Sequence, residues 1–351
     1  MKQKFYILLS LYFIVSCSLY IDNEQPDIFF EYTEFDILEL GGTYSDMEIS
    51  ADGQSIFLAD YNNNRIVKIN TGNTMNIDGF ITLGSHPGSL DLNSDRSIIA
   101  VALEGKSKVT ILETSNLEII NSFPISLMNV NDLAFVNDTT LIISSRTDPS
   151  CITLNINNSS EISQSVLNGE LAMDRDHDIL YVATSASIKK YNWDGVRFSQ
   201  DSNISDPYGF SSGKVHHFVY CNSNNTVFAC ISSMEEDVSV QHVYSYNGSD
   251  MTFAGKYLIK SPGLAVAVSM DGHRVFTAPT DADEMGVFVI EFDQKTKLES
   301  NYFLSAGNLT DRGLILDSQN QFLYILVNIP GDDDSFEPYN DYSFDLQRIK
   351  L

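Results

Sequence analysis

Seven weak copies of one pattern, spaced 39 to 48 residues apart, run through most of this chain. Each copy contains four short extended runs separated by turn signals. The clearest copy has its runs at Asp46–Ser50, Ser55–Asp60, Arg65–Asn70 and Gly79–Leu83. Asp52-Gly53, between the first two runs, favours a tight hairpin because Gly accepts a positive φ. Repeats of roughly 40–50 residues with four strands per unit are typical of β-propeller blades.

An apolar residue stands in the middle of the second run of every copy. These residues are Phe57, Ile99, Ile142, Tyr181, Phe228, Phe276 and Tyr324. The first run is often apolar on both faces, as in Leu264–Val268, so it must be covered on both sides. The inner strands of a propeller meet this condition, since each blade is packed between two others. We find no amphipathic helical period, and the sequence predicts an all-β fold of seven four-stranded blades.

The ends of the repeat region predict how the ring closes. The copies run over residues 43–84, 85–127, 128–167, 168–206, 207–260, 261–306 and 307–351. The last copy stops after its third run, Tyr342–Leu351, whereas the aromatic-rich segment Ile28–Leu40 precedes the first copy. We therefore expect residues 28–40 to supply the outer strand of the last blade, which makes 28–351 a single domain.

Three stretches resemble known propeller repeats. LADYNNNRIVKIN (58–70) is similar to an NHL repeat, and SHPGSLDLNSDRSIIAVA (85–102) and SMDGHRVFTA (269–278) resemble the YVTN repeat. Together they resemble the YVTN/NHL/lactonase-like seven-bladed β-propeller family across residues 28–351. The resemblance implies the fold. It does not imply one function, because that group includes lactonases, redox enzymes and pure binding proteins.

The N-terminus has the features of an export signal. Lys2 and Lys4 precede the apolar segment Phe5–Val15, which is shorter than the ~20 residues needed to cross a bilayer. The end of this segment, Ile14-Val15-Ser16-Cys17, resembles the lipobox of bacterial lipoproteins. The resemblance implies a lipid on Cys17, a signal peptide over 1–17 and a polar tether over 18–27. The lipid bilayer would then be a partner, and the protein would be exported and anchored in the bacterial cell envelope, at the outer membrane or cell surface. The alternative is an ordinary secretory signal with an incidental Cys.

Charge and cysteine content narrow the classes of partner. The net charge of −26 disfavours nucleic acid and anionic membrane surfaces and attracts cationic ligands, a basic protein or Ca²⁺. A high surface charge that keeps the protein soluble is the alternative explanation.

The number of cysteines bears on disulfide bonding. Three cysteines remain after Cys17, an odd number that argues against a full disulfide framework. We expect Cys151, Cys221 and Cys230 to be buried thiols, with Cys221 and Cys230 on adjacent strands but not opposite each other.

Polar residues near the starts of the innermost strands form the first candidate site. Alignment of the copies places Asp46, Ser89, Asp132, Glu170, His216 or His217, and Arg312 at the channel mouth. Neighbouring strand residues point to opposite faces, so at most one of the two histidines reaches the channel. Carboxylates in such a ring disfavour each other's ionisation or hold a hard cation such as Ca²⁺, and Arg312 could instead neutralise one of them. The alternative is that the strand starts are polar because water fills the channel.

The loops from the second to the third strand form the second candidate site. They share a face, which we call the top face, with the connections from each fourth strand to the next blade. In copies five to seven we expect them to be long and acidic, over Met234–Val240, Thr280–Gly286 and Asn328–Asp341. The last carries the acidic and aromatic candidates Asp332, Asp333, Asp334, Phe336, Glu337 and Tyr339. A solvated acidic loop is the alternative.

The sequence favours a non-catalytic binding module that presents its top face to a protein, peptide or glycan ligand. No catalytic residue is assigned, and no cofactor beyond Ca²⁺ is suggested. The alternative is a lactonase-like or other propeller hydrolase with acidic and His residues, and a divalent metal, at the channel mouth. The metal-ligand set of gluconolactonase-type propellers has no residue-by-residue match here.

Overall fold

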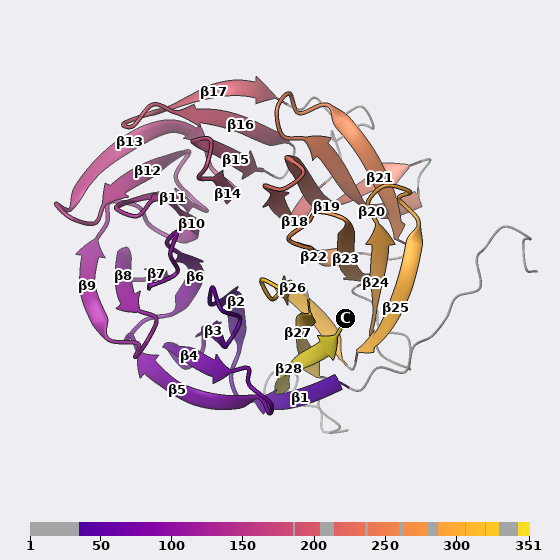
Figure 1. The fold of residues 1–351 in the computed structure, drawn as a ribbon. Coiled ribbons are helices and arrows are strands. Elements are labelled where there is room, and N and C mark those ends of the chain that lie inside the picture. Colours follow the sequence, from indigo (N-terminus) through magenta and orange to yellow (C-terminus); the bar gives the residue numbers. More distant parts are fainter. Residues whose placement is uncertain are drawn as a thin grey trace, which may run out of the picture.

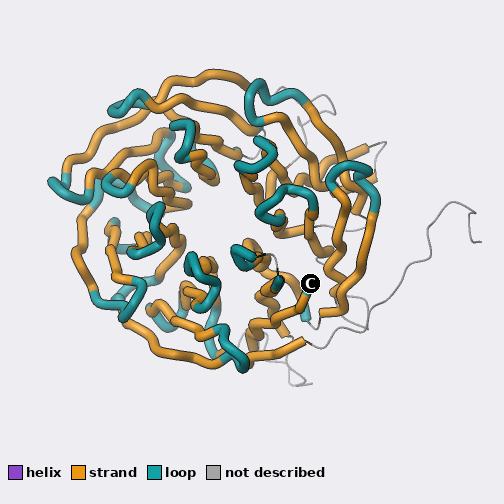
Figure 2. Tube along the Cα trace, viewed as in Figure 1, coloured by secondary structure: helices purple, strands orange, loops and turns teal. Residues whose placement is uncertain are grey.

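The computed structural model describes residues 35–184, 187–203, 214–235, 238–259, 263–279, 287–305, 307–319, 321–329 and 343–351. These residues form strands and connections without any helix. The strands make seven four-stranded antiparallel sheets arranged in a ring around a central axis (Figure 1). The tube in Figure 2 shows the same ring with loops and turns at its two faces.

The first four sheets, from the inner strand outward, are β2 (Tyr44–Ile49), β3 (Ser55–Asp60), β4 (Arg65–Asn70) and β5 (Asn76–Thr82); β6 (Pro87–Leu92), β7 (Ile98–Leu103), β8 (Lys108–Glu113) and β9 (Ile119–Pro124); β10 (Val130–Asn137), β11 (Thr140–Ser145), β12 (Ser150–Asn155) and β13 (Ser160–Leu167); and β14 (Glu170–Asp174), β15 (Ile179–Ala183), β16 (Ile188–Trp193) and β17 (Phe198–Asn203).

The last three sheets are β18 (Lys214–Cys221), β19 (Thr226–Glu235), β20 (Val238–Asn247) and β21 (Phe253–Ile259); β22 (Gly263–Val268), β23 (Arg274–Pro279), β24 (Val287–Asp293) and β25 (Glu299–Ser305); and β26 (Asn308–Leu316), β27 (Phe322–Ile329), β28 (Ser343–Lys350) and, outermost, β1 (Phe35–Leu40).

The repeat predicted from the sequence corresponds to the blades. β3 and β4 coincide with the predicted runs, whereas β5 begins at Asn76, three residues before the predicted Gly79. All seven apolar residues chosen to define the period lie in second strands, and each is at most 1% exposed. They are buried because the middle of a second strand is covered by the neighbouring blades. One hydrophobic cluster, for example, joins Phe57 of β3 to Ile99 of the next blade.

The predicted closure of the ring is confirmed for residues 35–40. β1 pairs antiparallel with β28, with Phe35 opposite Ile349 and Leu40 opposite Phe344. Residues 28–34 lie outside the described residues. The first and last strands of the domain therefore share one sheet, so the ring cannot open between its first and last blades without breaking this pairing (Figure 1).

Arg348 of β28 fastens this closure to the first blade. Its Nε donates to Asp36 Oδ2 of β1 at 3.0 Å, and Nη2 also contacts that carboxylate. The same guanidinium donates to the carbonyl oxygens of Thr71, Gly72 and Asn73, in the turn that precedes β5. One side chain thus connects the outer strand of the last blade to the outer part of the first.

The predicted loop over Met234–Val240 is wrong. β19 and β20 continue their pairing through Met234 opposite Ser239 to Glu235 opposite Val238. The connection is therefore confined to residues 236–237. Val238, Ser239 and Val240 alternate apolar and polar residues with the period of a strand, and this signal outweighs the acidic composition of the segment.

The three cysteines of the described chain are free and buried, as predicted. Cys221 on β18 lies opposite Thr226, and Cys230 on β19 lies opposite His217, so the two are on adjacent strands but not paired. Nowhere in the described ranges is there a helix with the length and hydrophobicity to cross a bilayer.

Replacement of Arg348 by Ala should lower the free energy of unfolding by about 2–4 kcal/mol, because the buried carbonyl oxygen of Thr71 and two part-buried carbonyl oxygens lose their donor. The Arg348 side chain is only 7% exposed, whereas its partner Asp36 is 54% exposed. Asp36→Asn should therefore cost less than about 1 kcal/mol. Urea denaturation of both variants tests this, and equal losses would contradict the role given to Arg348.

Candidate functional site

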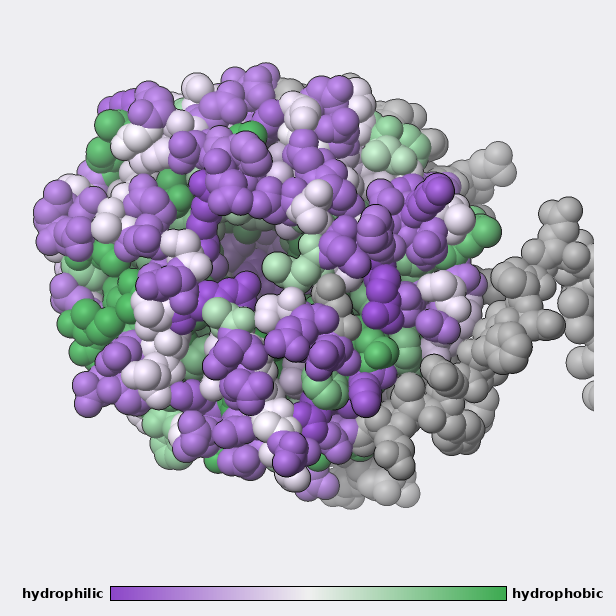
Figure 3. Space-filling view, viewed as in Figure 1, coloured by the Kyte–Doolittle hydropathy of each residue, from purple (hydrophilic) through white to green (hydrophobic). Residues whose placement is uncertain are grey.

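Cavities lined by residues that the structure describes follow the axis of the ring, where the innermost strands of the blades face one another, and three of them matter here. The first, which we call the inner cavity, has a volume of about 280 Å³. The second, the mouth cavity, is about 360 Å³ and lies at the starts of the inner strands. The third, of about 450 Å³, lies among β18, β22 and β26 towards the opposite face. Figure 3 shows a hollow at the centre of the ring with mainly hydrophilic residues around it.

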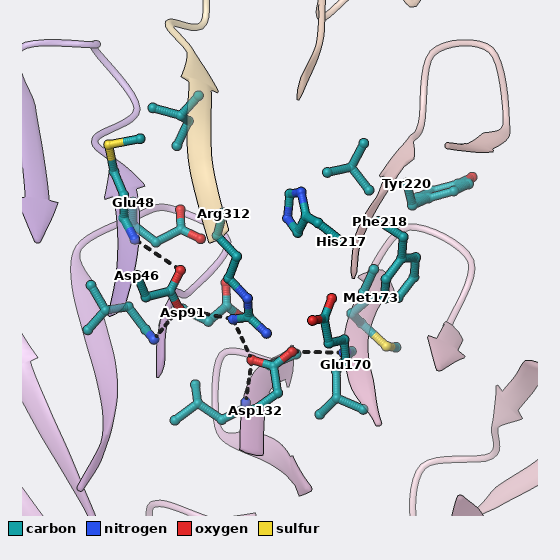
Figure 4. A pocket seen from close by; sticks show the side chains of 18 of the residues that line it. Asp46, Glu48, Asp91, Asp132, Glu170, Met173, His217, Phe218, Tyr220 and Arg312 are labelled. Atoms are coloured by element: carbon teal, nitrogen blue, oxygen red, sulfur yellow. Dashed lines mark hydrogen bonds and ion pairs between the residues drawn. The ribbon is translucent and has the colours of Figure 1, made fainter. Parts of the chain in front are cut away.

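Five of the predicted channel residues converge on the inner cavity. Asp46, Asp132, Glu170, His217 and Arg312 project into it from five different inner strands (Figure 4). His216 does not line any of the three cavities. His216 lies at the register shift between Val215 and His217 and is left out of the regular pairing of β18 with β19, whereas His217 faces the axis.

Irregular backbone positions Arg312. The pairing of β26 with β27 shifts register between Leu309 and Leu314, so the intervening residues leave the regular ladder. Arg312 has a φ of 56°, which few residues other than Gly adopt. Such strain persists where surrounding contacts fix it, and here the contacts are made by the Arg312 side chain.

Arg312 spans the channel between two carboxylates. Its Nη1 donates to Asp46 Oδ2 at 3.1 Å and to Asp132 Oδ1 at 3.0 Å (Figure 4). All three side chains are largely buried, with 18%, 6% and 5% exposure. Burial alone would lower the pKa of Arg312, but Asp132 and Asp46 hold it well above its usual value. The guanidinium therefore stays charged and joins blades seven, one and three across the axis.

Side chains on the inner strands also link four pairs of neighbouring blades through backbone amides. Asp46 Oδ2 accepts from Leu90 N at 2.8 Å, Asp91 Oδ2 from Phe135 N at 2.5 Å, Asp132 Oδ2 from Leu171 N at 2.8 Å, and His217 Nδ1 from Val266 N at 3.1 Å. Each of these bonds crosses from one blade to its neighbour. The polar residues of the channel are thus part of what holds the ring together.

The bond to Val266 fixes the proton of His217. Because Nδ1 accepts from a backbone N–H, it carries no proton, and the neutral ring must carry its proton on Nε2. Burial, and then the nearby Arg312, lower the pKa of His217 to about 3. At neutral pH His217 is therefore an uncharged hydrogen-bond donor within the inner cavity.

Sequence reasoning missed Glu48, Asp91 and Arg175, which also line the inner cavity. Arg175 Nη2 donates to Asp91 Oδ2 at 2.6 Å and Nε donates to the carbonyl of Phe135 at 3.0 Å. The sequence does contain a signal for two of these residues, Glu48 and Asp91. Glu48 and Asp91 stand two residues after Asp46 and Ser89, and that spacing puts both members of each pair on the same face of a strand.

Among the acidic side chains that line the inner cavity, Glu48 and Glu170 have no hydrogen bond or ion pair with any part of the chain that the structure describes. Burial, with the charges of Asp91 and Asp46, raises the pKa of Glu48 to about 8. Burial also raises the pKa of Glu170 to about 7, against the lowering effect of Arg312. Both groups are carboxyls whose charge changes close to neutral pH.

Glu170 and Arg312 line both the inner cavity and the mouth cavity, and so lie at the boundary between them. The mouth cavity is also lined by Asn131, Arg146 and the exposed Asp311. Arg146 pairs with Glu104 at 3.1 Å. Near neutral pH the mouth therefore has two cations that are already paired and two carboxyls, Glu170 and Asp311, that are not.

The remaining candidates are placed as follows. Asp332, Asp333, Asp334, Phe336, Glu337 and Tyr339 all lie outside the described residues. Within the described ranges no group of three or more His, Cys, Asp or Glu side chains is arranged to hold a metal ion. Asp46 and Asp132, the Ca²⁺ ligands expected from the sequence, both contact Arg312.

Comparison with known proteins gives structural similarity alone. No protein-family model matches the chain, and no curated protein matches it in sequence. Solved structures match it well. The chain is a seven-bladed β-propeller. It is similar to the WD40 repeats of RRP9, with 14% identity and a TM-score of 0.67 over 90% of this chain and 98% of that one.

Two further solved structures are similar to this chain over most of their length. A hydrazine synthase chain of Kuenenia stuttgartiensis has 9% identity and a TM-score of 0.66 over 87% of this chain and 95% of that one. U3-55K has 14% identity and a TM-score of 0.64 over 90% and 98%. Identities this low show a shared fold, and folds of this kind support many functions.

The free energy of unfolding should fall as pH rises from about 5 to 8. The folded-state pKa values of Glu48 and Glu170, about 8 and about 7, lie above their usual 4.5. A raised folded pKa gives stability that is complete below the unfolded pKa and is lost as pH approaches the folded one, by about 1.4 kcal/mol per unit and group. Glu48→Gln should flatten the profile most. Urea denaturation across this range tests it, with the exposed Glu118→Gln as control, and an unchanged profile in Glu48→Gln would contradict the assignment.

Proposed function

We propose that this protein is a non-catalytic binding module that recognises a protein, peptide or glycan ligand at the mouth cavity on its top face. The observation that supports this best is the position of Arg312. Held by Asp46 and Asp132, it lies between the mouth cavity and the inner cavity, and so makes the mouth a pocket with a charged floor. Concave pockets with a few convergent polar groups are the usual form of ligand sites.

The polar residues of the channel favour binding over catalysis. Asp46, Asp91 and Asp132 each accept from a backbone amide of the next blade, and each also pairs with an arginine. A group with these contacts contributes to the scaffold and has little freedom to exchange protons or bind a metal. The similar solved structures add the fold, whose rigid strands and variable loops suit a binding surface.

We further propose that the protein is exported and held in the bacterial cell envelope by lipid on Cys17. The support is the N-terminal sequence, where a basic start and a short apolar segment end in Ile14-Val15-Ser16-Cys17. Residues 18–27 would then link the anchor to the propeller. Metabolic labelling with a fatty acid and membrane fractionation of Cys17→Ser cells test this, and unchanged membrane association of the variant would contradict it.

Site-specific photo-crosslinking tests the binding face. Met128 (63% exposed) follows β9 on the top face, and Val196 (53% exposed) lies in the turn after β16 on the opposite face. A photoreactive amino acid at position 128, in cells that make the full chain, should give one defined adduct. The same residue at position 196 should give none. Equal adducts from both positions, or adducts from 196 alone, would contradict the proposed face.

A hydrolase of the lactonase kind is the second candidate. One observation favours it: Glu170 and His217 project into the same cavity, and a carboxyl with a pKa of about 7 suits general acid–base catalysis (Figure 4). Hydrolysis of simple lactones that is lost in Glu170→Gln would support it. The absence of hydrolysis by the wild-type protein would leave the binding module.

A Ca²⁺ ion in the ring belongs with this second candidate. It would have to displace Arg312 from Asp46 and Asp132, the carboxylates best placed to ligate it. Thermal melts with and without Ca²⁺, on the wild type and on Asp46→Asn with Asp132→Asn, test this. A melting temperature that rises with Ca²⁺ only in the wild type would favour the metal.

A further inference from the structure

The mouth cavity is lined by two acidic groups, Glu170 and Asp311, that no residue of the described chain pairs. Asp46 and Asp132 each accept from a backbone amide of the next blade, whereas Glu170 accepts from none among the residues of blade five that the structure describes. Glu170 has a longer side chain than Asp46 and Asp132, and β18 begins with a register shift at Val215. Its carboxyl points into the inner cavity (Figure 4), and Glu170 also lines the mouth cavity.

Glu170 is half-buried and lines both cavities. Its environment is acidic: four carboxyls, those of Asp46, Asp132, Glu170 and Asp311, lie around the single guanidinium of Arg312. Arg146 adds no free charge because it pairs with Glu104. A second cation entering from the mouth would therefore be attracted, and its natural acceptors are Glu170 at the floor and Asp311 at the rim.

The shape of the mouth limits the size of that cation. A cavity of about 360 Å³ is at the small end of the roughly 300–1,000 Å³ typical of ligand pockets, so it admits one side chain or small group rather than a folded element. Asn131 on its wall offers an amide as a further polar contact. Donor-rich organic cations, the guanidinium of arginine and the ammonium of lysine, match two carboxylates and an amide.

We propose that the mouth cavity receives an arginine or lysine side chain of a protein partner, with Glu170 and Asp311 as the acceptors of its hydrogen bonds. This inference rests on the binding function proposed above and specifies its partner as basic at the contact. The net charge of −26 acts in the same direction, because it attracts basic proteins over longer distances.

Proton linkage follows from this arrangement. An arginine ligand keeps its charge at all relevant pH values, so a change of affinity with pH comes from the protein. The cation favours ionised Glu170, whose pKa is about 7 in the free protein, so affinity should rise from pH 6 to pH 8 with release of a proton. His217 stays neutral in this range, and Glu48 lines the inner cavity rather than the mouth. Arg312, Asp46 and Asp132 also face Glu170. Arg312 keeps its charge, because Asp132 and Asp46 hold its pKa well above the usual value. Burial raises the pKa of Asp46, so comparison with Glu170→Gln is needed to assign the pH dependence to Glu170.

Calorimetric titration of the full chain in detergent tests the inference, with N-acetyl-arginine amide as the probe. The uncharged citrulline analogue is the ligand control, and Glu118→Gln, an exposed site on the turn after β8, is the protein control. We expect Glu170→Gln to weaken arginine binding at least ~10-fold and to abolish its pH dependence. Asp311→Asn should weaken binding less, since Asp311 is exposed, and citrulline should not bind.

Three results would each overturn the inference. The first is equal binding of the arginine and citrulline probes, the second is unchanged arginine binding by Glu170→Gln, and the third is no arginine binding to the wild type. Crosslinking from position 128 distinguishes failure of the cationic site from failure of the proposed binding function. If the adduct from position 128 persists in Glu170→Gln with Asp311→Asn, the top face binds its partner by other contacts. The proposed function then stands and the cationic site falls. Thermal melts of each variant confirm that it is folded.

Discussion

The contact of Arg312 with Asp46 and Asp132 organises the centre of this propeller. A buried guanidinium without carboxylates, or these carboxylates without the guanidinium, would be strongly destabilising. Together they connect three blades across the axis and stand between the mouth and inner cavities. The positive φ of Arg312 is a local cost that these contacts offset.

The same contact determines which groups are left for a ligand. Arg312 is shared by Asp46 and Asp132, and Arg175 is paired with Asp91. Among the described residues Glu170 is left without an ion pair, and burial raises its pKa to about 7. The perturbed carboxyl is thus a consequence of how the ring is held together, and structural and functional roles divide among residues of one polar ring.

The fold was accessible from the sequence because its signals are local and repeated. Asp52-Gly53 marks a hairpin, Phe57 and its equivalents mark second strands, and the unmatched segment before the first copy predicted the pairing of β1 with β28. The loop expected after Met234 was wrong because acidic composition was given more weight than the alternation of Val238 and Val240. The placement of polar residues on inner strands was also predictable, since the repeat aligns them.

The partners of those residues were not predictable. Arg312 contacts Asp46 and Asp132 because a register shift in β26 and the positive φ of Arg312 set the direction of its side chain. Glu48 and Asp91 carry a spacing signal, but their pairing depends on Arg175, which follows β14 two blades from Asp91. Such contacts come from the closed ring, and no single copy of the repeat contains them.

Infrared titration of the protonated carboxyl signal tests this account most directly, in the wild type and in Glu170→Gln. If Arg312 serves Asp46 and Asp132 and leaves Glu170 unpaired, the wild type has a carboxyl that loses its proton near pH 7, and the variant lacks that component while keeping the one from Glu48 near pH 8. Identical titrations of the two proteins would contradict the account, because they would mean that Glu170 is ionised throughout and paired within the ring.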